Sequence, residues 1–242
     1  MASTSEVGHA KNVANFQDLM AFVNGYGANY NPSKTSLKPP QLEALYNQAS
    51  AGLNGVITKN TAYNNAVNQR MEVFSDMRPL ATRLVNALAT TNAGEEKVED
   101  AKSFNRKIQG QRASKKVEPL DPNQPVPKTI SSSQQSYDQL IQHFEGMISV
   151  LDSEPSYTPN ETDLKITTLQ TKLQELKDAN ENVSKAYAQV SNARLDRNKI
   201  LYAKDAGLVD VSADVKKYVK SVFGATSEEF AQVKGIQLVK VK

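Results

Sequence analysis

Apolar residues recur at every third or fourth position along most of this chain, and that spacing is typical of amphipathic helices. Two stripes are long and regular, with steps that alternate between four and three residues, as in helices that pack at a shallow angle. The first predicts a long helix over residues 40–74, with stripe positions Leu42, Tyr46, Ala49, Leu53, Val56, Asn60, Tyr63, Val67, Arg70 and Phe74. The second predicts a long helix that ends near residue 202, with stripe positions Leu169, Leu173, Leu176, Asn180, Val183, Tyr187, Val190, Arg194, Arg197 and Leu201.

The two stripes are related by a constant offset of 127 residues. Residues 30–74 align with residues 157–201 without a gap, and 10 of the 45 pairs are identical. A fixed period of this kind indicates one structural unit used twice. The identical positions of the first copy are Tyr30, Pro32, Thr35, Leu37, Lys38, Leu42, Val56, Asn65, Ala66 and Arg70.

Shorter helices are expected beside each long one, at residues 16–26, 79–91, 95–108, 137–148, 211–223 and 226–234. Residues 158–161 read Thr-Pro-Asn-Glu, a capping box that predicts the start of the second long helix. Residues 226–229 read Thr-Ser-Glu-Glu and predict a second capping box. Residues 236–241 alternate apolar and polar side chains, which favours a short C-terminal strand.

The predicted fold is therefore all-α, with two homologous helical-bundle repeats that each hold one long helix and shorter flanking helices. We expect a flexible N-terminal arm at residues 1–11, repeat 1 at 12–108 and repeat 2 at 136–242. Residues 109–135 contain Pro119, Pro122, Pro125 and Pro127 and a run of three serines, so they are expected to form an extended linker.

Composition narrows the function classes. The chain has no cysteine, which excludes disulfides, thiolate metal sites and cysteine nucleophiles and fits a reducing compartment. The first residues lack the basic and apolar regions of a secretion signal, and no apolar run approaches the ~18 residues of a membrane span. We expect a cytoplasmic protein, with signal-less export left open.

Two clusters of basic residues are the most distinctive charged features. The first is Lys102, Arg106, Lys107, Arg112, Lys115 and Lys116; the second is Lys216, Lys217 and Lys220. Such clusters neutralise phosphates in nucleic-acid-binding proteins, yet aromatic residues for base stacking are few here. A solvated helix end, an acidic protein partner and a nucleic acid remain alternatives for both clusters.

Arg70 and Arg197 occupy the same late position of the two stripes. We expect structural ion pairs there, with a ligand anchor as the alternative. His9 and His143 are the only histidines, and neither has the sequence neighbours of a metal or catalytic site. No glycine-rich phosphate-binding motif occurs. We therefore expect no cofactor and no enzymatic activity.

Two further segments carry a resemblance. They are residues 97–110 (KVEDAKSFNRKIQG) and residues 201–224 (LYAKDAGLVDVSADVKKYVKSVFG). Both resemble segments of uncharacterised helical proteins of Bacteroidota. The resemblance implies an all-helical tandem-repeat family and brings no activity or functional residues.

A duplicated unit carries duplicated surfaces, which can join copies in a series that does not close. The sequence therefore favours a structural, self-assembling protein that forms a homo-oligomer, a filament or a tube through helical packing surfaces. The alternative is a nucleic-acid-binding or adaptor module that uses the two basic clusters.

Overall fold

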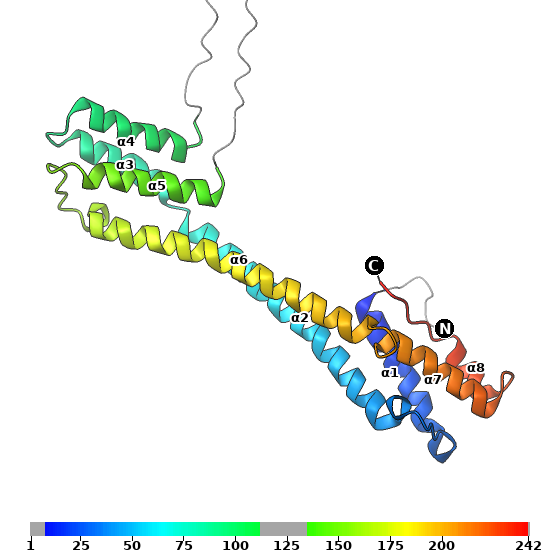
Figure 1. Ribbon diagram of the computed structural model, residues 1–242. Helices are drawn as coiled ribbons and strands as arrows, with labels where there is room; N and C mark the ends of the chain where they lie inside the picture. The colour runs from blue at the N-terminus through cyan, green and yellow to red at the C-terminus, as the bar shows by residue number, and fades with distance from the viewer. Residues whose placement is uncertain (1–7, 112–134, 242) are drawn as a thin grey trace, which may run out of the picture. The chain divides into compact units, whose positions relative to one another are not determined.

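A computed structural model describes residues 8–111 and 135–241, and every regular element in these ranges is a helix (Figure 1). The all-α prediction is confirmed. The α-helices are α1 (His9–Gly25), α2 (Pro39–Val73), α3 (Met77–Ala89), α4 (Glu95–Ile108), α5 (Tyr137–Asp152), α6 (Ile166–Tyr202), α7 (Leu208–Phe223) and α8 (Glu228–Lys234). Three short 3-10 helices are η1 (Gly27–Asn29), η2 (Thr35–Leu37) and η3 (Thr162–Leu164).

Three local predictions need correction, and the first concerns the N-terminal arm. Helix α1 begins at His9, so residues 9–11 are helical rather than part of the arm expected at 1–11. The remainder of that arm, residues 1–7, lies outside the described ranges, as do residues 112–134 of the expected linker.

The capping box at residues 158–161 does not start the second long helix. Helix α6 begins at Ile166, after the 3-10 turn η3. The hydroxyl of Tyr157 donates to the carbonyl oxygen of Leu164 at 2.9 Å, which closes a tight loop over these residues and delays the helix. The second capping signal is confirmed with a shift of one residue, because the Ser227 hydroxyl accepts from the Phe230 amide at the start of α8.

The short C-terminal strand is absent from the described part of the chain. Residues 236–241 are extended, but no neighbouring strand edge is present to pair with them. Side-chain amides of Asn12 and Asn15 on α1 bind this backbone in place of a strand edge.

The loops before the two long helices are alike. Helices η2 and η3 begin 127 residues apart, at Thr35 and Thr162. The Tyr30 hydroxyl donates to the Leu37 carbonyl oxygen at 2.9 Å, and Tyr157 makes the same bond to Leu164 at 2.9 Å. Both tyrosines are buried, and burial raises the pKa of each hydroxyl, that of Tyr157 to about 12. A buried hydroxyl needs such a partner, so each tyrosine fixes the path of its loop.

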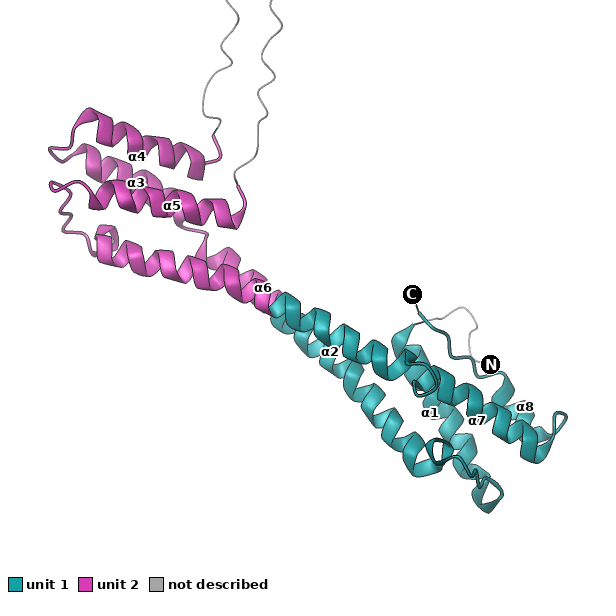
Figure 2. Ribbon diagram, in the orientation of Figure 1, with its two compact units in different colours: residues 1–63, 186–242 teal, residues 64–185 magenta. Residues whose placement is uncertain are grey.

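The chain divides into two compact units, residues 1–63 with 186–242 (unit 1) and residues 64–185 (unit 2), coloured separately in Figure 2. These units do not follow the expected boundaries at 12–108 and 136–242. Each unit instead takes helices from both sides of residues 109–135. Helices α2 and α6 contribute one part to unit 1 and another to unit 2.

Unit 1 combines α1 and the first part of α2 with the last part of α6, α7 and α8. Helix α1 packs on α7 and α8, and the core is made of fully buried apolar side chains. Its most deeply buried members include Phe16, Leu19, Leu42, Leu201, Leu208 and Val215. Within this unit α2 and α6 run antiparallel: Lys59 donates to Gln189 at 3.0 Å, and the rings of Tyr63 and Tyr187 lie 5.8 Å apart.

Unit 2 combines the last part of α2, α3 and α4 with α5 and the first part of α6. Helix α4 packs on both α3 and α5. The unit has a core of its own, which includes Leu84, Leu88, Ile108, Phe144, Met147, Leu169 and Leu176. The two units therefore share one plan, in which the start of one half of the chain packs with the end of the other half. In unit 1 these are α1 with α7 and α8, and in unit 2 they are α5 with α3 and α4.

Candidate interaction sites

Residues 236–241 of unit 1 lie against α1 and α7 and are held through their backbone (Figure 1). The side chain of Asn12 donates to the Val239 carbonyl oxygen at 2.7 Å and accepts from the Val239 amide at 2.9 Å. Asn15 donates to the Gln237 carbonyl oxygen at 2.6 Å, and Lys216 donates to that of Ile236 at 2.8 Å. We call Asn12, Asn15 and Lys216 the backbone cradle.

The two asparagines of the cradle are buried polar groups. Asn12 is 2% exposed and Asn15 is 8% exposed, and they lie one helical turn apart on α1 beside the core residues Val13 and Phe16. A buried amide is costly unless its hydrogen bonds are satisfied. The extended segment supplies these bonds, so the cradle and the segment complete each other.

Charged groups support the same contact. Burial lowers the pKa of the Lys216 ammonium group, and its hydrogen bond to the Ile236 carbonyl oxygen gives this partly buried group a polar partner. Lys240, within the extended segment, lies 3.1 Å from Asp210. The pKa of Asp210 is lowered, first by a hydrogen bond from the Asp205 amide and then by Lys240. This exposed pair adds orientation more than stability.

A polar group at the start of α1 adjoins the cradle. The Tyr202 hydroxyl lies 2.7 Å from Nδ1 of His9 and 3.2 Å from the side-chain nitrogen of Asn12. Burial lowers the pKa of His9, with a further contribution from the charge of Arg197. His9 therefore serves as a neutral hydrogen-bond partner of Tyr202 near neutral pH.

The described members of the first basic cluster lie on α4 and contact other groups of that helix. Lys102 and Arg106 both pair with Glu99, at 3.4 and 2.8 Å, and lower the pKa of that carboxyl. Lys107 lies over the Phe104 ring, 5.1 Å from its centroid. Arg112, Lys115 and Lys116 lie outside the described ranges.

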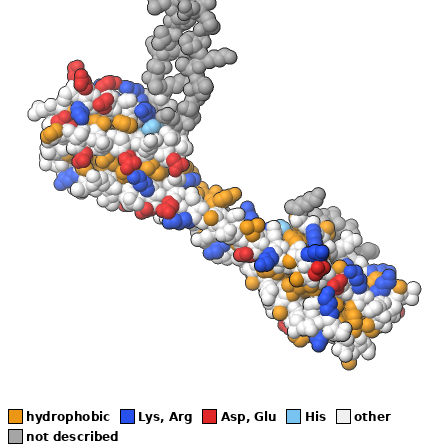
Figure 3. Space-filling view, in the orientation of Figure 1, with side chains coloured by type: hydrophobic (Ala, Val, Ile, Leu, Met, Phe, Trp, Pro, Cys, Tyr) orange, Lys and Arg blue, Asp and Glu red, His pale blue; other side chains and the backbone are white. Residues whose placement is uncertain are grey.

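The second basic cluster also makes contacts inside the chain. Lys216 belongs to the backbone cradle, Lys217 pairs with Asp214 at 3.2 Å, and Lys220 lies over the Phe230 ring. On the face drawn in Figure 3, basic and acidic side chains are interspersed over the described helices. An interaction role for the two clusters stays a prediction, and these intrachain contacts do not favour it.

Neither arginine of the stripes forms the predicted ion pair among the described residues. Arg70 donates to the Asn180 side chain at 2.9 Å, and its guanidinium lies 3.9 Å from the centre of the Tyr137 ring. Asn180 in turn donates to Asp138 at 2.8 Å, so an amide connects the two charges. Arg197 donates to its neighbour Asn198, at 2.8 and 3.1 Å.

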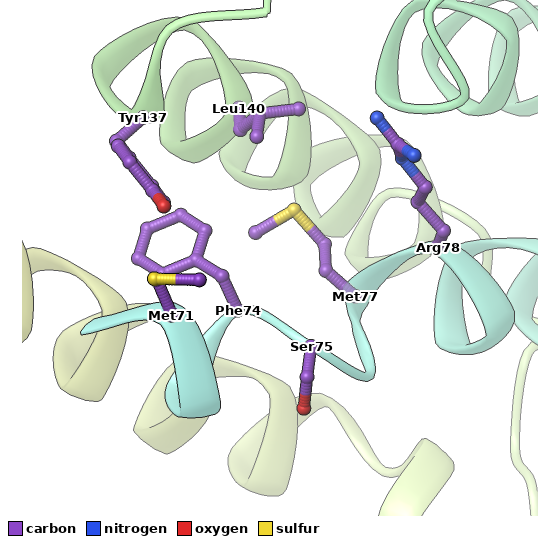
Figure 4. Close-up of a pocket in the computed structure, with 7 residues that line it drawn as sticks. All are labelled: Met71, Phe74, Ser75, Met77, Arg78, Tyr137 and Leu140. Atoms are coloured by element: carbon purple, nitrogen blue, oxygen red, sulfur yellow. The ribbon is translucent and has the colours of Figure 1, made fainter. Parts of the chain in front are cut away.

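A shallow hollow of about 260 Å³ lies in unit 2 beside Arg70. Its lining is mostly apolar, with Phe74 and Tyr137 edge to face at 4.7 Å (Figure 4). Arg78 at its border is already bonded to the Ile108 carbonyl oxygen and to Gln135. The other polar groups of the hollow are the Ser75 hydroxyl, which donates to the Glu72 carbonyl oxygen, and the Tyr137 hydroxyl, so the hollow does not gather the several polar groups of a specific ligand site.

Residues 8–111 and 135–241 hold neither a cluster of metal ligands nor a helix that could span a membrane. Within them, no group of three or more histidines or acidic residues has the arrangement to hold a metal ion. No helix there is long and apolar enough to cross a bilayer.

Neither protein-family models, nor curated proteins, nor solved structures yield a match to this chain. Functional proposals therefore rest on its own geometry.

Sequence reasoning missed the backbone cradle. Asn12 and Asn15 fall before the short helix that the sequence predicted at residues 16–26, and residues 236–241 were predicted to form a strand. The available signal was the pair of amides spaced three residues apart and flanking the apolar Val13 and Phe16. That spacing places both on the buried side of α1, where an amide requires a partner.

Proposed function

We propose that this protein is a structural, self-assembling component that pairs its helical packing surfaces with those of other copies. One observation supports this most directly: each compact unit is completed by helices from both halves of the chain. Every copy of the chain has the same helical surfaces through which its two halves pack together. The halves of two copies can therefore complete each other, either as a closed dimer or as an open series.

We further propose that the two halves descend from one duplicated unit. The offset of 127 residues relates the long helices and the 3-10 turns, and the Tyr30 and Tyr157 hydrogen bonds correspond at the same offset. Duplication would account for two units with one plan. A cytoplasmic location is part of this proposal and fits the cysteine-free composition.

An engineered disulfide tests pairing between copies. A β-carbon at Gly52 of α2 would lie 3.7 Å from the β-carbon of Arg197 on α6. That separation falls within the range of about 3.5–4.5 Å found in disulfides. Gly52→Cys and Arg197→Cys are made in separate chains, mixed at high concentration and oxidised. Because the natural chain has no cysteine, a covalent dimer that contains one chain of each variant reports a contact between these two positions.

The expected result is a Gly52→Cys/Arg197→Cys heterodimer, accompanied by higher-mass species in light scattering and by regular assemblies in negative-stain images. Gly55→Cys is the matched control, since a β-carbon there meets no atom within 4 Å. A clean monomer at high concentration, with no more cross-linking at position 52 than at position 55, would refute the proposal.

A further inference from the structure

We propose that the backbone cradle of unit 1 is a binding site for an extended peptide, and that it takes residues 236–241 of a second copy in exchange for its own. This inference rests on the proposed self-assembly and adds a second contact to it. The cradle comprises Asn12 and Asn15 on α1 and Lys216 on α7, as described above.

The three polar side chains of the cradle bind the backbone of the segment rather than its side chains. The donors of the cradle reach the carbonyl oxygens of Ile236, Gln237 and Val239, and Asn12 also accepts from the Val239 amide. The paired bonds between Asn12 and Val239 imitate those that a neighbouring strand would make. Recognition by strand addition uses the same main-chain groups.

The segment is weakly anchored by its own side chains. Ile236 and Leu238 are partly buried and pack against the core of unit 1, but no side chain of residues 236–241 is fully buried and Val239 is 44% exposed. The last fully buried anchor before the segment is Val233 on α8. Regions with few buried apolar contacts open locally without global unfolding. We therefore expect the segment to leave the cradle while α1, α7 and α8 stay folded.

An open cradle can accept a new occupant. When the segment leaves, Asn15 loses its bond to Gln237 and Asn12 loses both bonds to Val239 while keeping its contact with the Tyr202 hydroxyl, so the cradle offers free amide groups to an incoming backbone. The same segment is present on every copy, so a second copy offers an occupant that already fits. The chain's own segment competes with an effective concentration in the millimolar range, which confines exchange to high local concentration, as in an assembly.

A complementation experiment tests the second copy as occupant. One variant lacks residues 236–242 and therefore has a vacant cradle. The other carries Asn12→Leu and Asn15→Leu and therefore has a released segment. The expected result is that an equimolar mixture shows a heterodimer in light scattering that neither variant forms alone. If both variants are helical by circular dichroism and the mixture adds no mass, the inference is overturned.

A labelled peptide of residues 235–242 tests the recognition by backbone. We expect it to bind the chain that lacks residues 236–242, and to bind the intact chain at least about tenfold more weakly because of the competing segment. Methylation of the Val239 nitrogen in the peptide removes the donor to Asn12 and leaves the side chain intact. Equal binding of the methylated peptide would overturn the inference.

Hydrogen exchange on the intact chain keeps the inference testable if a variant does not fold. The Val239 amide is expected to exchange at least about tenfold faster than the protected amides of α1, because it opens locally. Equal protection would mean that the segment leaves only on unfolding, which would overturn the exchange. The Gly52–Arg197 cross-link reports pairing of the halves separately, so failure of either proposal can be recognised.

Discussion

His143 is a buried titratable side chain of unit 2. It lies on α5, is 5% exposed, and its Nε2 atom has no hydrogen-bond partner. Burial lowers the pKa of the imidazole, and the charge of Lys107 lowers it further. The ring is thus held neutral, and a proton on it would be an unpaired charge in the core.

Stability should therefore depend on pH through His143. Because its folded pKa is lowered, the unfolded chain binds the proton first as the pH falls. Stability is fully present above the unfolded pKa of about 6.5 and is lost as the pH drops from there toward the folded pKa, by about 1.4 kcal/mol for each unit of lowering. Urea unfolding at a series of pH values measures this loss.

The control for that prediction is His143→Leu, which retains apolar volume and removes the titrating group. His9, whose pKa is also lowered, titrates in the same window and is removed with His9→Gln. We expect His143→Leu to flatten the profile of the natural chain below pH 6.5. An unchanged profile would show that another group carries the dependence.

At the scale of the elements, two glycines show how differently helices are constrained. Gly146 lies on α5 where α4 crosses it, and a β-carbon there would come within 2.4 Å of the Phe104 ring. Gly55 lies within α2 and would meet no atom within 4 Å. The first glycine permits close packing of two helices, whereas the second only weakens its helix.

Alanine at these two positions should change stability in opposite directions. Gly146→Ala overpacks the contact between α4 and α5 and should cost about 1–3 kcal/mol. Gly55→Ala should stabilise α2 by about 0.5–1 kcal/mol, because alanine is the better helix former. Thermal and urea unfolding of both variants test the contrast. A neutral Gly146→Ala would mean that Phe104 moves aside at little cost.

At the scale of the whole molecule, the chain passes between its two compact units only inside α2 and α6. Residues 109–135 connect parts that both belong to unit 2. A cut in that segment would therefore leave each unit with all its helices, although the chain becomes two fragments. Two independent repeats with boundaries at 12–108 and 136–242 would behave differently.

A protease site inserted after residue 122 distinguishes these organisations. We expect the cleaved protein to elute as one species, because each fragment supplies helices to both cores, and to separate only in denaturant. The uncut chain with the same insertion is the control. Fragments that separate under native conditions would contradict the interleaved arrangement and support independent repeats.

The sequence by itself determined that the chain is helical and that two of its helices are long and carry apolar stripes, because helical periodicity is a local property. It also predicted correctly that Arg70, Arg106 and Arg197 lie on helices. The pattern did not predict the partners of these residues, because an apolar stripe does not specify which helix packs on it. Examples are Glu99 for Arg106 and Asn180 for Arg70.

Only the tertiary structure decided which half supplies each helix of a unit. It also decided that Asn12 holds the backbone of Val239 from 227 positions away. The physical reason is that an apolar stripe is compatible with any complementary stripe, so the choice among partners depends on the fit of whole surfaces. Buried polar groups then select the arrangement in which all their hydrogen bonds are made.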